Sequence, residues 1–178
     1  MVRNIFLTVV CVSSIQSYCQ TDCYSLSGTG VDSVAAQNGI NIVYDTSGVD
    51  SNIVNFAMGQ WNDCSGNVPQ FTSNSTSSTG PAVRVSIEQS NAPMNKLALY
   101  DITDKSITLY TKTYGGDNID PNLFPKILMH ELGHALGLAD VSGSANSGCL
   151  MGQGVPTNNV VQADCYVIVD IWRSAFNN

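Results

Sequence analysis

The segment at residues 130–140, HELGHALGLAD, constrains the fold of this chain more than any other segment. A helix places residues four apart on one side, so His130 and His134 would direct both imidazoles to one point in space. Gly137 has no Cβ and can adopt the left-handed conformation that ends a helix and turns the chain back. Asp140 can then bring its carboxylate to the same point. The pattern predicts a helix, a sharp turn and three converging polar side chains.

These three side chains suit a catalytic zinc ion, which takes three protein ligands and keeps an open position for water. The chain contains no further histidine, so we predict His130, His134 and Asp140 as the ligands. Glu131 is rotated about a quarter turn from the first histidine and can reach a metal-bound water without binding the metal. Zinc lowers the pKa of that water from about 15.7 towards about 7, and a carboxylate can take its proton during attack on a carbonyl. A glutamate ligand from a later helix is excluded, because Glu88 and Glu131 are the only glutamates.

Other interpretations of the same residues exist. Two histidines and a glutamate on an amphipathic helix can be ordinary surface or core residues, but Gly137 and Asp140 at this spacing favour a metal site. A purely structural zinc ion is less expected, because such sites are usually closed by four ligands and rich in cysteine. We expect the cysteines of this chain to form disulfides instead of binding a metal.

Composition bounds the class of protein. The 178 residues correspond to one domain with a sizeable core. The net charge is -7, and the seven Lys and Arg residues are scattered, which argues against nucleic acid as a partner. No apolar run is long enough to span a bilayer, so we expect no membrane anchor.

The N-terminus predicts a secretion signal at residues 1–19. Arg3 supplies a positive charge, residues 5–12 an apolar core, and residues 17–19 a small-x-small cleavage site. The alternative is a buried first strand. We therefore expect a secreted protein whose residues 20–178 form a single domain.

Removal of residues 1–19 leaves an even set of cysteines, Cys23, Cys64, Cys149 and Cys165. An even set in an exported chain suggests two disulfides, with three pairings open. We expect Cys149 with Cys165 and Cys23 with Cys64, because each pair would tie a terminal segment to a neighbouring element. The first closes a loop of about seventeen residues and would contribute roughly 3 kcal/mol in the chain-entropy model.

Strands and helices alternate along the first half of the chain. The apolar patterns at Ile40–Tyr44, 69–72 and 82–87 predict strands. Between the first two lies a predicted helix with Asp50 or Ser51 as its N-cap, whose apolar residues recur at helical spacing.

The second half leads to the motif helix and a final helix. Residues 97–102 and 106–111 predict an antiparallel hairpin. The motif helix is expected to begin with Asn122 as N-cap and Pro125 in the first turn, where the missing N–H has no helical partner. Residues 158–176 predict a C-terminal helix that covers the core.

The motif, followed by Cys149-Leu150-Met151, resembles the metzincin clan of zinc endopeptidases. Those enzymes carry HExxHxxGxxH, or its Asp variant, followed by a methionine-containing turn. Asn122-Leu123-Phe124 also resembles the matrixin branch, whereas the Asp ligand and the cysteine before Leu-Met look more like snapalysin-type secreted bacterial proteases. The resemblance covers about residues 97–173.

The resemblance implies an α+β fold of the α/β-type metzincin kind. Its parts are a twisted, mixed and mostly parallel sheet with an antiparallel edge strand, an active-site helix, a methionine-containing turn and a C-terminal helix. Met151 would pack beneath the metal as a buried, non-ligating residue. An extended peptide would add to the edge strand that contains Leu97, Ala98, Leu99 and Tyr100. The alternative is an edge strand shielded by a loop.

Some features of the sequence depart from the metzincin pattern, and others suggest further ligands only by analogy. Residues 152–156 lack the Pro-x-Tyr pattern of many matrixins and offer no tyrosine ligand. Calcium is implied by analogy, and Asp117, Asn118 and Asp120 could supply oxygen ligands or simply solvate the turn. Cys23 could instead hold the zinc in a latent form.

The sequence thus predicts a monomeric, secreted zinc endopeptidase that hydrolyses extended protein or peptide substrates, with Glu131 as general base. A catalytically silent binding module on a metzincin scaffold is the alternative from another class, and the presence of Glu131 argues against it. An aspzincin-type protease also uses an aspartate ligand. The short spacing from Gly137 to Asp140 argues against that family.

Overall fold

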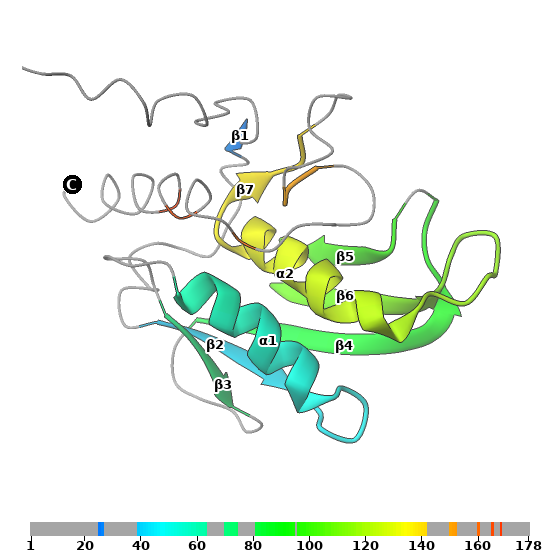
Figure 1. The fold of residues 1–178 in the computed structure, drawn as a ribbon, viewed down its shortest axis with the longest axis horizontal. Coiled ribbons are helices and arrows are strands. Elements are labelled where there is room, and N and C mark those ends of the chain that lie inside the picture. Colours follow the sequence, from blue (N-terminus) through cyan, green and yellow to red (C-terminus); the bar gives the residue numbers. More distant parts are fainter. Residues whose placement is uncertain are drawn as a thin grey trace, which may run out of the picture.

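A computed structural model of the chain describes residues 25–26, 39–63, 70–74, 81–94, 96–141, 150–152, 160, 165 and 168. The predicted secretion signal, residues 1–19, lies outside this part of the chain and stays a prediction. Figure 1 shows the arrangement, with two helices lying against one sheet.

The main sheet contains β2 (Ile40–Tyr44), β3 (Phe71–Asn74), β4 (Ala82–Asn91), β5 (Ala98–Asp101) and β6 (Ser106–Lys112). Its strand order is β3-β2-β4-β6-β5. The pairs β3–β2, β2–β4 and β4–β6 are parallel, and β5 pairs antiparallel with β6 at the edge. The prediction of an α+β fold with a mixed, mostly parallel sheet and an antiparallel edge strand is confirmed at this level.

Several strand bounds differ from the predicted ones. β3 runs two residues later than the predicted 69–72, and β4 continues to Asn91 rather than ending at residue 87. β5 is shorter than the predicted 97–102 at both ends. Its early end has a local cause, because the Asp101 carboxylate accepts hydrogen bonds from the N–H groups of Thr103 (2.7 Å) and Asp104 (3.1 Å). These bonds turn the chain before β6.

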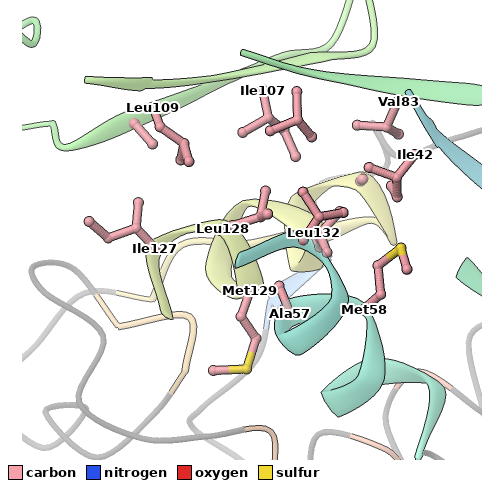
Figure 2. Packing of buried hydrophobic residues seen from close by; sticks show 14 of the residues in the cluster. Ile42, Ala57, Met58, Val83, Ile107, Leu109, Ile127, Leu128, Met129 and Leu132 are labelled. Atoms are coloured by element: carbon pink, nitrogen blue, oxygen red, sulfur yellow. The ribbon is translucent and has the colours of Figure 1, made fainter. Parts of the chain in front are cut away.

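The helices α1 (Ser51–Asn62) and α2 (Phe124–Ala135) lie against the same face of the sheet, as Figure 2 shows. The Asp50 side chain caps α1 and accepts the Asn52 N–H at 2.8 Å. Of the two predicted caps for this helix, Asp50 is therefore the one in place.

The predicted start of α2 was wrong. Asn122 lies inside a 3-10 turn, η4 (Pro121–Leu123), rather than at an N-cap. The Asp120 carboxylate accepts the Asn122 N–H at 2.9 Å, so the chain begins to coil before the α-helix does. The α-helix starts at Phe124 and keeps Pro125 in its first turn, as expected from its missing N–H.

Apolar side chains fill the space between the sheet and the helices (Figure 2). Ile107 and Leu109 point from β6 towards α2, which presents Leu128 and Leu132 to the sheet. All four are fully buried, and each such residue contributes roughly 2 kcal/mol through loss of contact with water. Because this face of α2 packs against the sheet, the remaining faces of the helix are available for contacts with other parts of the chain.

A second, two-stranded sheet lies next to the end of α2. β1 (Ser25–Leu26) pairs antiparallel with β7 (Leu138–Ala139), with Ser25 opposite Ala139. The sequence did not predict either strand, because two residues carry no periodicity that could be recognised. β7 holds the chain that leads directly to Asp140.

The predicted C-terminal helix is described at few residues. Cys165 and Ile168 are helical, and Ile168 is fully buried in the core. The rest of residues 158–176, apart from Val160, lies outside the described residues. Cys23, Cys64 and Cys149 also lie outside the described residues, so both predicted disulfides stay predictions. Within the described chain, the helices are too short or too polar to cross a membrane.

Candidate metal centre

The end of α2 and the turn that follows it bring three polar side chains together. His130 and His134 lie one helical turn apart on α2. The helix ends at Ala135, and Gly137 has a φ of 97°, a left-handed conformation that a residue with a Cβ rarely adopts. The chain then returns through β7 to Asp140. The predicted sequence of helix, glycine turn and returning aspartate is confirmed as geometry.

The distances among the three side chains fit one metal ion. Asp140 Oδ1 lies 3.1 Å from His130 Nε2 and 3.4 Å from His134 Nε2. Three atoms that each lie about 2.0–2.1 Å from a tetrahedral zinc ion would be roughly 3.3 Å apart. Among the described residues, these form the one group of three or more His, Cys, Asp or Glu side chains close enough to hold a metal.

Backbone carbonyls orient both imidazoles. His130 Nδ1 lies 2.7 Å from the carbonyl oxygen of Leu150, and His134 Nδ1 lies 2.8 Å from that of Leu138. A carbonyl can only accept, so each Nδ1 must carry a proton and donate it. In a neutral imidazole this leaves Nε2 with a free lone pair, which is the form that binds metals.

The three converging atoms therefore need positive charge between them. Two unprotonated Nε2 atoms and a carboxylate oxygen would otherwise repel one another at these distances. The balance can come from extra protons on the histidines or from a metal ion. Hydrogen bonds from the histidines hold the pKa of Asp140 far below its ordinary value. Burial lowers the pKa of His134, but its bonds to Asp140 and the Leu138 carbonyl and the charge of Glu131 outweigh this and raise it.

Glu131 lies beside the group without belonging to it. Its side chain is buried, with 7% of the residue exposed, and it is not among the three residues that could share a metal. Burial raises the pKa of Glu131, and the positive charges that His130 and His134 can carry act in the opposite direction. A buried carboxylate next to a cation site is well placed to exchange a proton with a molecule bound there.

The centre is open on one side. The Asp140 side chain is 43% exposed, whereas those of His130 and His134 are 10% and 19% exposed. The two rings meet edge to face, with centroids 4.9 Å apart. A small molecule or an extended chain can thus approach from the Asp140 side.

Met151 is fully buried, as predicted, and packs against α2. A Cβ on Gly133 would lie 2.5 Å from Met151 Sδ, so a larger residue there would displace the methionine side chain. The Val141 N–H donates to the Met151 carbonyl at 2.9 Å, which joins this turn to the chain after Asp140. The turn thereby also holds the Leu150 carbonyl against His130.

One contributor to this region was missed by sequence reasoning. Trp61 of α1 is one of the apolar residues whose helical spacing predicted this helix, and its indole N–H donates to the Met129 carbonyl at 2.9 Å. A sequence pattern reports that Trp61 faces inward and does not report which buried acceptor it finds.

The predicted substrate strand lies at the sheet edge. Ala98, Leu99 and Tyr100 belong to β5, which contacts α2, and Leu97 immediately precedes the strand. The predicted calcium ligands lie in and next to the turn before α2. Asp117 and Asn118 are exposed, and Asp120 caps the 3-10 turn, so calcium at this turn stays a prediction.

Sequence comparison adds no relative to these observations. A scan against protein-family models and a search of curated proteins found no match for the chain.

Proposed function

We propose that this protein is a secreted zinc-dependent endopeptidase that cleaves extended protein or peptide substrates. The observation that carries the proposal is the convergence of His130 Nε2, His134 Nε2 and Asp140 Oδ1 beside the buried Glu131 carboxylate. A zinc ion held by the first three would polarise the carbonyl of the scissile bond and make a water molecule acidic.

The donor set alone does not select zinc. Two imidazoles and one carboxylate also suit iron(II) in oxygen-dependent enzymes. The buried Glu131 supports hydrolysis instead, because a general base is what hydrolysis needs at this place.

Glu131 acts as general base and then as general acid. It accepts a proton from the attacking water and passes it to the nitrogen that leaves the cleaved bond. Its buried position favours this role, because burial raises the pKa of the carboxyl group and makes it a better proton acceptor than an exposed glutamate.

The carbonyls of Leu150 and Leu138 fix the tautomer and orientation of the two histidines. Partners of this kind commonly change metal affinity or activity by about 10–100-fold when they are lost. In this chain both are main-chain groups, so they depend on the paths of β7 and of the turn at Met151.

The edge strand β5 supports an extended substrate. The Tyr110 N–H donates to the Leu97 carbonyl at 3.2 Å. In an antiparallel ladder the alternate residues, Ala98 and Tyr100, then direct their N–H and C=O groups away from β6. Among the described residues, β5 is the last strand on this side of the sheet. An added peptide strand could bind there, next to α2.

The test is metal content together with cleavage of unfolded casein, with and without a chelator. The purified residue 20–178 protein should bind one zinc and lose activity with the chelator. Glu131→Gln should keep the zinc and lose about 10²–10⁴-fold in turnover, and Asp140→Ala should lose both. Glu88→Gln, which removes the other glutamate, an exposed one on β4, serves as the matched control.

Each alternative predicts a different result. A catalytically silent binding module would hold zinc and cleave nothing. Unchanged turnover in Glu131→Gln would refute the assignment of the general base. Bound iron in place of zinc would point to the oxygen-dependent class.

A further inference from the structure

We propose that Trp61 of α1 is a positioning residue of the metal centre, and that it acts through the main chain between the two histidines. The inference rests on the proposed function in so far as it assumes that His130 and His134 bind a metal ion. It assigns a role in metal binding to a residue of a different helix, 68 positions away from its hydrogen-bond partner.

The hydrogen bond is placed at the turn of α2 that carries the ligands. Trp61 Nε1 donates to the Met129 carbonyl at 2.9 Å, and both residues are buried, with 1% and 0% exposed. Met129 directly precedes His130. Its carbonyl is also the helical acceptor for the N–H of Gly133, which directly precedes His134. One oxygen therefore links Trp61 to both ends of the helical turn between the ligands.

The indole ring reaches the same turn by direct packing. A Cβ on Gly133 would lie 3.3 Å from Trp61 Cζ2 and 2.5 Å from Met151 Sδ. The ring, the glycine and the methionine thus meet at one place. Met151 follows Leu150, whose carbonyl accepts the hydrogen bond of His130 Nδ1. Trp61 consequently borders both the helix that carries the ligands and the turn that orients one of them.

The N–H group distinguishes Trp61 from the other buried residues of α1. Val54, Ala57 and Met58 are buried by apolar contact and have no side-chain donor. A phenylalanine at position 61 would supply most of the apolar surface of Trp61. Phenylalanine could not form the hydrogen bond, which fixes the position of α2 along its helix axis. That position determines where the two imidazoles lie relative to Asp140.

The experiment uses Trp61→Phe in the residue 20–178 protein. Zinc affinity is measured by competition with a chelating dye, and the coordination geometry by the visible spectrum of the cobalt(II)-substituted protein. We expect zinc to bind about tenfold more weakly and the cobalt(II) bands to shift. The kcat on a peptide substrate should fall while KM stays nearly unchanged.

Val54→Ala is the matched control, because it weakens the packing of α1 without removing a hydrogen bond. It should lower the stability of the fold and leave zinc affinity and the cobalt(II) spectrum as in the wild type. An equal loss of zinc affinity in Val54→Ala and Trp61→Phe would overturn the proposal, since ordinary packing would then explain both. Unchanged zinc affinity in Trp61→Phe would overturn it as well.

A second replacement covers the case in which Trp61→Phe does not fold. A benzothienylalanine at position 61 has the shape of tryptophan with sulfur in place of the N–H group. It should fold and still bind zinc more weakly than the wild type, and wild-type affinity would refute the proposal. Failure of the proposed function is recognised separately, as a wild-type protein that binds zinc and cleaves no peptide.

Discussion

Replacing Asp140 by alanine should remove most of the stabilisation of this protein by zinc. Asp140 Oδ1 lies 3.1 Å and 3.4 Å from the two histidine nitrogens, so the substitution removes one of three ligands. The side chain is 43% exposed, and its loss leaves no cavity in the core. The effect on the metal-bound protein should therefore far exceed the effect on the metal-free protein.

The expected magnitude follows from binding linkage. A wild-type protein in zinc at about 100 times its Kd gains about 2.7 kcal/mol. For a chain of this size, each kcal/mol raises Tm by about 2–4 °C, which gives a shift of roughly 5–11 °C. If the loss of one ligand raises the Kd for zinc by about 100-fold, the zinc concentration used for the wild type equals the Kd of the variant. The gain is then about 0.4 kcal/mol, or a shift of about 1 °C.

The assay is thermal unfolding with and without zinc, for the wild type, Asp140→Ala and Asp117→Ala. Asp117 is an exposed aspartate in the turn before α2, and its variant should keep the full zinc shift. The reasoning would be refuted if Asp140→Ala kept a shift equal to that of the wild type. A ligand other than Asp140 would then complete the site.

Three further outcomes are expected. Zinc affinity should fall as pH decreases from about 8 to about 5, because the raised pKa of His134 lets protons compete for its nitrogen; chelator competition across this range measures it. The metal-free wild type should lose stability towards urea as pH rises from 4.5, the ordinary pKa of Glu131, through the raised pKa that this group has in the folded state. The reason is that the folded protein keeps the Glu131 proton at a pH where the unfolded chain has lost it. Metal-free Glu131→Gln has no such proton and should not show this loss. Asp50→Ala should cost about 1 kcal/mol in urea unfolding, since it removes the cap on the Asn52 N–H, and no change would mean that α1 does not need this cap.

The candidate ligands could be predicted because their geometry is local. The spacing of His130 and His134 needs only a helix to place both imidazoles on one side. Gly137 and Asp140 need only the turn that ends that helix, and Gly137 indeed has a φ of 97°. Alternating apolar residues likewise predicted β2 with both of its ends, and the starts of β4 and β6, which both continue beyond their predicted C-terminal ends.

Bounds set by single side-chain hydrogen bonds were predicted less well. The start of α2 was placed at Asn122, but the Asp120 carboxylate begins the coil with a 3-10 turn. Similarly, the turn that ends β5 depends on which N–H groups the Asp101 carboxylate reaches. Periodicity averages over several residues and does not resolve such choices.

The sequence by itself determined the three converging side chains, the neighbouring Glu131 and the antiparallel hairpin of β5 and β6. Only the tertiary structure decided what surrounds them: the Leu150 carbonyl on His130, the pairing of β1 with β7, and the Trp61 bond to Met129. The physical reason is that periodicity reports how a residue is turned relative to its neighbours in the chain. The partner of a buried polar group depends instead on the path of segments that are far away in sequence.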